Sequence, residues 1–239
     1  MTIAKNQAKL GHCYERNYTQ MGYVVETIKL VSDILDTNPD LYSMLELGNQ
    51  YIFPNGNTEV NNFNLNPYPG GNVAKSYFTQ RYSSLLHTSV DYNGQDGALK
   101  IDLSAPNALR HLGLYDVITN LGTLEHVGEG HTDESLILKA QYEAFKNVHD
   151  SLSVDGVWFN LGPHVGSWPG HCPCYYTIPF FEELLSKNGY TEIRSPEKYT
   201  YSDPNTELFV LFIAHKIKDV EFMSLVEFKL LRGFMEIVL

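Results

Sequence analysis

Residues 43–56 read SMLELGNQYIFPNG, and the interpretation of the whole chain depends on this stretch. SMLEL is a short apolar run after the helix-breaking TNPDL, which predicts a buried strand. Glu46 stands near its end and Gly48 follows it, and a glycine there allows close approach of the backbone to a ligand. Nucleotide-binding turns usually carry two or three glycines, but Asn49 and Gln50 follow here. The stretch therefore leaves a binding site and a plain loop as alternatives.

After this strand, the chain alternates between strand-like and helix-like segments. The strand-like segments are LLHTSVD (85–91), ALKIDLS (98–104), YDVITN (115–120), GVWFNLG (156–162) and two final runs joined by SDPN. Helical periodicity covers residues 73–83, 134–152 and 178–190. Such alternation predicts an α/β fold with a doubly wound, mostly parallel seven-stranded sheet and an antiparallel C-terminal hairpin.

Three further segments flank or interrupt this core. Residues 1–42 contain an amphipathic helix over 17–38 and are expected to form an N-terminal helical cap. Residues 49–71, rich in Asn, Pro and Gly, are interpreted as an insertion in the domain of residues 43–217. Residues 218–239 form an apolar tail, for which a packed helix and a homodimer contact are the alternatives.

Composition restricts the class of protein. A chain of 239 residues with 43% hydrophobic residues can bury one full sheet. The net charge of −11 and the lack of a basic stripe argue against nucleic acid as a partner. No signal peptide or membrane-length apolar run is present, so we expect a soluble cytoplasmic protein with no membrane partner. Three cysteines in such a chain are expected to be reduced thiols.

Ligands of parallel sheets bind beyond the carboxyl ends of the strands, and four strand ends carry acidic, polar or glycine residues. In order, LELGNQ, TSVDYNG, LKIDLS and YDVITNLGTLEHV resemble the motifs of class I S-adenosylmethionine-dependent methyltransferases of the small-molecule type. The resemblance covers about residues 43–216 and implies the Rossmann-like methyltransferase fold. The first motif departs from the family pattern, because only one of its glycines is present.

The resemblance implies a role for each residue at the strand ends. Asp91 would bind the donor's ribose, with Tyr92 beside it as a further donor-binding residue, and Asp102 and the backbone of Leu103 would meet its adenine. The methionine part would meet the remaining residues: Glu46, Gly48, Asn49, Gln50, Asn120 and Leu121. Each feature alone has a plainer explanation, since DYNG can be an ordinary turn and Asp102 can cap the following segment.

Methyl transfer from a sulfonium is an in-line displacement, so the protein has to position an acceptor and, for some acceptors, remove a proton. Glu125, His126 and His171 are the candidate catalytic residues, with His164 as a further histidine near a strand end. His126 has an architectural role as an equal alternative. The aromatic side chains expected to wall the acceptor pocket are Trp168, Tyr175, Tyr176 and Phe180.

The stretch His171-Cys172-Pro173-Cys174 raises the question of a metal. Structural zinc sites normally use C-x2-C spacing with a second ligand pair, and only Cys13 remains elsewhere. We therefore expect no metal site.

Two other functions compete with a methyltransferase that acts on a small or medium-sized acceptor. The degenerate first motif and the apolar tail are consistent with a non-catalytic methyltransferase-like binding or assembly module. A nicotinamide-dependent oxidoreductase is the third alternative, although its phosphate-binding turn tolerates the loss of glycines less well.

Overall fold

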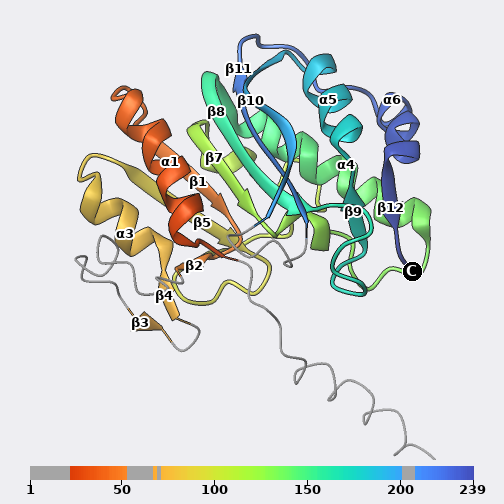
Figure 1. Ribbon diagram of the computed structural model, residues 1–239, viewed down its shortest axis with the longest axis horizontal. Helices are drawn as coiled ribbons and strands as arrows, with labels where there is room; N and C mark the ends of the chain where they lie inside the picture. The colour runs from red at the N-terminus through yellow and green to blue at the C-terminus, as the bar shows by residue number, and fades with distance from the viewer. Residues whose placement is uncertain (1–21, 53–66, 69–70, 201–207) are drawn as a thin grey trace, which may run out of the picture.

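A computed structural model describes residues 22–52, 67–68, 71–200 and 208–239 of the chain. One seven-stranded sheet runs through the molecule with helices on both faces (Figure 1). Its strand order is β10 (Tyr190–Tyr199), β11 (Phe209–Lys216), β8 (Leu152–Pro163), β7 (Tyr115–Leu121), β1 (Ser43–Leu47), β5 (Leu86–Asp91) and β6 (Leu99–Lys100). Neighbours from β8 to β6 pair in parallel, whereas β11 pairs antiparallel with both β8 and β10. The predicted doubly wound sheet with an antiparallel hairpin is confirmed.

Some element boundaries differ from the expectation. The third strand is shorter than residues 98–104, because the chain turns at Asp102, whose carboxylate accepts the Ser104 backbone N–H at 2.9 Å. A helix was expected over residues 17–38, and the structure has one over Val25–Thr37. Residues 1–21 lie outside the described part of the chain. Most of the predicted insertion and the SDPN turn also lie outside it.

Both faces of the sheet are buried, which explains the nearly continuous apolar strands. Met44 and Val117 point to the face covered by two helices, whereas their neighbours Leu45 and Ile118 point to the opposite face. The first face carries α1 (Val25–Thr37) and α3 (Ala74–Arg81), and the second carries α4 (Glu134–Ser151), α5 (Ile178–Lys187) and α6 (Leu225–Leu230) (Figure 1). Each large apolar side chain buried in this way contributes about 1.5–3 kcal/mol.

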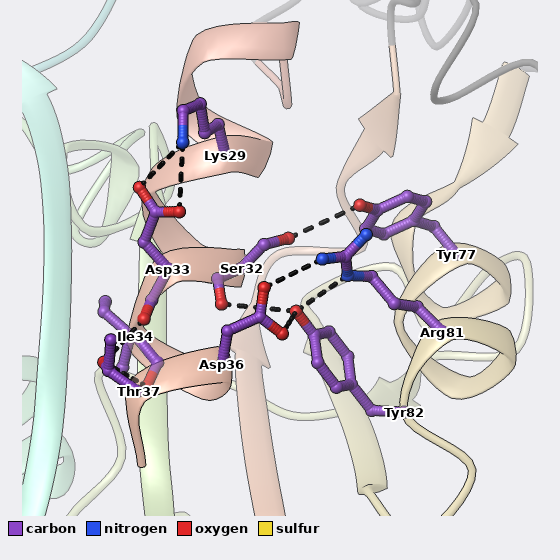
Figure 2. A network of polar contacts seen from close by, with 9 residues as sticks. All are labelled: Lys29, Ser32, Asp33, Ile34, Asp36, Thr37, Tyr77, Arg81 and Tyr82. Atoms are coloured by element: carbon purple, nitrogen blue, oxygen red, sulfur yellow. Dashed lines mark hydrogen bonds and ion pairs between the residues drawn. The ribbon is translucent and has the colours of Figure 1, made fainter. Parts of the chain in front are cut away.

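Polar contacts join α1 to α3 on the first face (Figure 2). The Asp36 carboxylate accepts from Arg81 Nη2 at 2.8 Å and from the Tyr82 hydroxyl at 2.9 Å. The Tyr82 hydroxyl also lies 3.2 Å from the Ser32 carbonyl oxygen. These groups are partly exposed, so the apolar contact beneath them, which includes the fully buried Phe78, supplies most of the stabilisation.

The C-terminal tail packs on the second face. It consists of α6, the 3-10 turn η3 (Leu231–Phe234) and β12 (Met235–Ile237), which pairs antiparallel with β9 (Cys174–Tyr176). Phe228 is fully buried, whereas Val226 and Leu230 are exposed. Among the described residues, no helix has the length and apolar composition needed to cross a membrane.

At the two ends of the predicted insertion, three short strands form a separate small sheet. Its order is β2 (Tyr51–Ile52), β4 (Gly71–Val73) and β3 (Pro67–Tyr68). The small sheet follows directly on the turn after β1, and the Ala74 backbone N–H donates to the Gln50 carbonyl at 2.9 Å. The start of α3 is thereby tied to the turn that opens the candidate site.

Candidate functional site

A cleft of about 660 Å³ lies at the carboxyl ends of the parallel strands. Its walls come from the ends of β5 and β6, from the turn after β7, and from the segment that follows the 3-10 turn η2 (Leu124–His126). β1 lies between β5 and β7, where the order of the strands along the sheet reverses. A doubly wound sheet binds its ligands at such a point.

Five of the residues singled out in the sequence line this cleft: Asp91, Tyr92, Asp102, Leu103 and His126. The first four come from neighbouring strand ends, as expected from the parallel pairing of β5 with β6. Tyr92 is largely exposed and Leu103 is buried. The sequence pattern therefore located one side of the cleft well.

Asp91 is held in place by backbone amides. Its Oδ2 accepts from Asn49 N at 3.1 Å and its Oδ1 accepts from Asn93 N at 2.9 Å. Each carboxylate oxygen has a second lone pair, so both can accept a further hydrogen bond from a ligand. The surrounding backbone thus fixes the carboxylate without exhausting its capacity.

Asp102 and Leu103 are fixed in a similar way. Asp102 Oδ1 accepts from Ser104 N at 2.9 Å and from the Ser104 hydroxyl at 2.6 Å. The Leu103 carbonyl oxygen accepts from Asn147 Nδ2, on α4, at 2.9 Å. The helix therefore anchors the short turn after β6 against the second face of the sheet.

The turn after β1 works with a single glycine because side chains fill the remaining space. Gly48 has φ +74°, and a Cβ there would lie 2.2 Å from Thr123 Oγ1 and 2.6 Å from Gln50 Nε2. Gln50 Nε2 donates to the Leu47 carbonyl at 3.2 Å and to Thr123 Oγ1 at 3.1 Å. Gly48 is thus required by close packing across the turn, and Gln50 braces that turn from within.

The remaining candidates at the end of β1 do not line the cleft. Glu46 is fully buried, with Oε1 accepting from Gln50 N at 3.0 Å and Oε2 3.6 Å from His87 Nε2. The Asn49 side chain accepts from the Ser89 hydroxyl at 3.1 Å and donates to the Asp96 carbonyl at 3.3 Å. Both side chains act here as cross-links between the strand-end loops.

Asn120 and Leu121 also lie elsewhere than expected. Both side chains are buried, and Leu121 packs in the core of the first face. Asn120 Oδ1 accepts from Thr123 N at 3.1 Å and from Leu124 N at 3.0 Å, which fixes the start of η2. The residues after β7 that do line the cleft are Gly122 and Thr123.

Glu125, His126 and His171 come together beside the cleft. Their ligand atoms all lie within 4.8 Å of one another, and we refer to them as the Glu-His-His cluster. The two imidazole rings meet edge to face with centroids 4.8 Å apart. His126 lines the cleft, and its Nδ1 lies 3.2 Å from Glu129 Oε2.

The electrostatics of the cluster follow from its burial. Burial raises the pKa of Glu125 to about 7, and the charge of His126 opposes this only in part. Burial and the neighbouring His126 lower the pKa of His171 to about 4. Burial also lowers the pKa of His126, but its hydrogen bond to Glu129 and the charge of Glu125 outweigh burial and leave that pKa raised.

The expected aromatic wall is mostly part of the core. Tyr175, Tyr176 and Phe180 are almost fully buried, and the Tyr176 hydroxyl donates to Gln141 Oε1 at 2.7 Å. Trp168 is only half-buried, and its carbonyl accepts from the Tyr175 hydroxyl at 2.6 Å. His164 Nδ1 lies 2.6 Å from the Val165 carbonyl oxygen, and His164 is not a member of the Glu-His-His cluster.

Cys172 and Cys174 are buried free thiols, and Cys172 Sγ donates to the Cys174 carbonyl at 3.1 Å. Cys13 lies outside the described residues. Of the stretch HCPC, only His171 belongs to a group that could hold a metal within the described part of the chain. Its companions there are Glu125 and His126, which lie far from His171 in the sequence.

No protein-family model and no curated protein matches the chain. Among solved structures, the 1,6-didemethyltoxoflavin-N1-methyltransferase of Burkholderia thailandensis is 16% identical, with a TM-score of 0.45, over 80% of this chain and 78% of that one. CalS10, an amino pentose methyltransferase from Micromonospora echinaspora, is 10% identical with a TM-score of 0.45, over 80% and 90%. An O-methyltransferase family protein from Burkholderia thailandensis is 10% identical with a TM-score of 0.45, over 81% and 58%. The chain therefore spans little more than half the length of that last structure.

Similarity at these identities says nothing of the substrate, and the sheet itself decides the fold. The strands from β8 to β6 run parallel, the order reverses at β1, and β11 enters antiparallel between β8 and β10. This is a doubly wound, Rossmann-like sheet with an antiparallel hairpin. In a doubly wound sheet of this kind the cleft lies at the edge where ligands bind.

Gly122, Thr123 and Glu129 are among the cleft-lining residues that were not chosen from the sequence. Gly122 and Thr123 directly follow the residues that were chosen, so the error is a shift of two positions at the end of a strand. The glycine in NLGT was the available signal, since Gly122 has φ +80°. The sequence carries no comparable signal for Glu129, because its contact with His126 depends on how η2 folds.

Proposed function

We propose that this protein is an S-adenosylmethionine-dependent methyltransferase that acts on a small or medium-sized acceptor. The observation that supports it best is the arrangement of Asp91 and Asp102 on one cleft at the ends of adjacent parallel strands. An ionised carboxylate can accept from both hydroxyls of a ribose, and the ends of β5 and β6 offer such a group together with an apolar neighbour, Leu103. The cleft volume of about 660 Å³ is within the range of small-molecule sites.

In this proposal Asp91 binds the ribose of the donor and Asp102 and Leu103 hold its adenine. The methionine part extends toward the turns at Gly48 and at Gly122–Thr123. Since the donor carries no pyrophosphate, a glycine-rich phosphate cradle is not required. One glycine braced by Gln50 is compatible with that ligand.

The acceptor is proposed to enter on the side of the Glu-His-His cluster, whose His126 lines the cleft. Transfer breaks the bond between the donor's sulfur and its methyl carbon and forms a bond from that carbon to the acceptor. An acceptor hydroxyl or protonated amine also releases a proton, and S-adenosylhomocysteine leaves. Side chains of the cluster are candidates to receive that proton.

The proposal includes a small-molecule partner and no nucleic acid, consistent with the net charge of −11. A cytoplasmic location is part of the proposal as well. The exposed apolar residues of the tail, such as Val226 and Leu230, leave the homodimer as a further hypothesis. None of the described features favours the non-catalytic module.

The experiment is a transfer assay with a trideuteromethyl donor and a panel of phenols, amines and thiols, read by mass spectrometry. We expect labelled product from at least one acceptor class, a rise in donor KM for Asp102→Ala, and a fall in kcat for His126→Ala. His111→Ala is the matched histidine control, because His111 is exposed and outside the cleft. Donor binding without product from any acceptor class would instead support the binding module.

A further inference from the structure

The Glu-His-His cluster contains buried polar atoms without partners. Glu125 is fully buried, and neither of its carboxylate oxygens has a hydrogen-bond partner among the described residues. His171 Nε2 is buried and equally unpartnered within the described part of the chain. Buried polar atoms without partners cost about 1–3 kcal/mol each. Such a group in a native fold calls for an explanation, and a ligand missing from the site is one.

The three side chains approach one another without hydrogen-bonding to one another. Their ligand atoms all lie within 4.8 Å of one another, which brings them near the spacing of ligands around one shared ion. Ligands of a first-row ion lie about 2.0–2.2 Å from it, so neighbouring ligand atoms sit about 3–3.5 Å apart.

The ligand types restrict the ion. Two imidazoles and one carboxylate suit a divalent first-row transition metal such as zinc, and three protein ligands leave a position for water or substrate. Magnesium and calcium prefer sites built from oxygen ligands. The composition of the cluster therefore selects a transition metal over the alkaline earths.

Glu129 supplies the outer contact that such a site needs. Its Oε2 lies 3.2 Å from His126 Nδ1 and fixes that ring so that Nε2 is the nitrogen left for an ion. Metal-binding histidines usually donate their second ring N–H to a carboxylate or a carbonyl in this way. This contact is independent of the unpartnered atoms of Glu125 and His171.

The neighbouring thiols are poor competitors for the ion. Cys172 and Cys174 are buried free thiols, and neither belongs to the group of side chains whose ligand atoms gather within 4.8 Å of one another. Cys172 Sγ is also engaged with the Cys174 carbonyl oxygen. The imidazoles and the carboxylate remain as the available ligands.

We propose that Glu125, His126 and His171 bind one divalent transition-metal ion, with its open position facing the cleft. Because His126 is part of the cleft wall, a molecule in the cleft can reach that position. This inference rests on the proposed methyltransferase function. If both hold, the acceptor is a molecule with an oxygen or nitrogen atom that can bind the metal. An acceptor hydroxyl bound there would lose its proton to water more readily, and the three side chains would serve as ligands instead of bases.

The test uses the full chain, stripped with EDTA and titrated with Co²⁺ and Zn²⁺ by calorimetry and absorption spectroscopy. We expect one ion per chain, a rise in Tm with the ion, and a Co²⁺ spectrum without a thiolate charge-transfer band. Glu125→Gln and His171→Ala should each weaken binding at least about 100-fold, and the outer Glu129→Gln about 10-fold. His111→Ala should bind as the wild type does.

Far-UV circular dichroism without metal checks that each variant folds. Glu129→Gln keeps the test decisive if the buried variants do not fold, because the Glu129 side chain is 65% exposed and its replacement should leave the fold intact. Absence of stoichiometric binding, wild-type affinity in Glu125→Gln and His171→Ala, or a thiolate band would overturn the proposal. Binding of S-adenosylhomocysteine is measured separately on the metal-free chain. If these residues bind Co²⁺ but the chain does not bind S-adenosylhomocysteine, the metal site is supported and the proposed methyltransferase function is contradicted.

Discussion

The two edges of the parallel strands differ in how their polar side chains are bonded. At the amino edge, Asp116 Oδ2 accepts hydrogen bonds from the backbone N–H groups of Tyr42 and Ser43 at 2.9 and 3.0 Å. At the carboxyl edge, neither carboxylate oxygen of the buried Glu125 has a hydrogen-bond partner among the described residues. The amino edge also has a cleft, of about 470 Å³, lined among others by His149 and Lys216. Those two groups are satisfied within the protein. Lys216 Nζ donates to the carbonyl oxygens of His149 and Leu152 at 2.8 and 2.9 Å.

The difference separates structural polar groups from those available to a ligand. A buried polar group that is fully hydrogen-bonded stabilises one conformation and has little capacity left. Asp91 and the Glu-His-His cluster retain that capacity, and both adjoin the same cleft. Volume alone would not have distinguished the two clefts.

The largest effect on stability is expected for Gly48→Ala, at the carboxyl edge. The new Cβ would meet Thr123 Oγ1 at 2.2 Å in a backbone with φ +74°, so the free energy of unfolding should fall by about 2–4 kcal/mol. Gly113→Ala is the control, since Gly113 has φ +88° and nothing within 4 Å of its Cβ position. Urea unfolding measures both, and equal losses would mean that backbone strain alone matters at Gly48.

Asp116→Ala, at the amino edge, should cost somewhat less. It removes three hydrogen bonds to one carboxylate oxygen, from Tyr42 N, Ser43 N and the Ser43 hydroxyl, and leaves the site intact. We expect a loss of about 2–3 kcal/mol in the free energy of unfolding. Asp116→Asn keeps one acceptor oxygen and should lose less. A change in the affinity for S-adenosylhomocysteine in either variant would contradict the separation of a structural amino edge from a ligand-binding carboxyl edge.

The smallest effect concerns pH and His149. His149 Nε2 lies 2.8 Å from the Val220 carbonyl oxygen and Nδ1 lies 3.1 Å from the Tyr190 hydroxyl, so a neutral ring that donates from Nε2 satisfies both contacts. Burial is the main reason why its pKa is lowered, and nearby Lys216 adds to the effect. Below about pH 6.5 the unfolded chain binds a proton that the folded chain does not, so stability falls with falling pH.

This one group contributes at most about 1.4 kcal/mol per pH unit, and only below pH 6.5. His149→Gln should reduce the slope of unfolding free energy against pH in that range. Identical slopes for the variant and the wild type would show that the buried ring does not titrate as described.

How much the sequence predicts depends on the range of the interactions. Strand ends follow from local apolar runs, and so Asp91 and Asp102 were found. Asn120 was expected on the cleft because its strand was read as ending there, but tertiary packing buries it and exposes Gly122 instead. The proximity of His171 to Glu125 depends on how two distant loops meet, and periodicity carries no such information.

The aromatic residues illustrate a second limit. Tyr175, Tyr176 and Phe180 satisfy the description of a pocket wall and of a core equally well, because both are apolar and rich in rings. Only the packing of α5 and β9 against the sheet decides that these three are buried. Similarly, HCPC drew attention to cysteines, whereas the side chains that gather around His171 come from η2.

The central claim is that the carboxyl edge binds an adenosyl ligand through Asp91. Calorimetric titration of S-adenosylhomocysteine into the wild type, Asp91→Ala and Asp116→Ala tests it most directly. We predict binding to the wild type and to Asp116→Ala, and at least about 100-fold weaker binding to Asp91→Ala, because two charge-assisted hydrogen bonds are lost. Failure of the wild type to bind, or equal affinity of Asp91→Ala, would contradict the account.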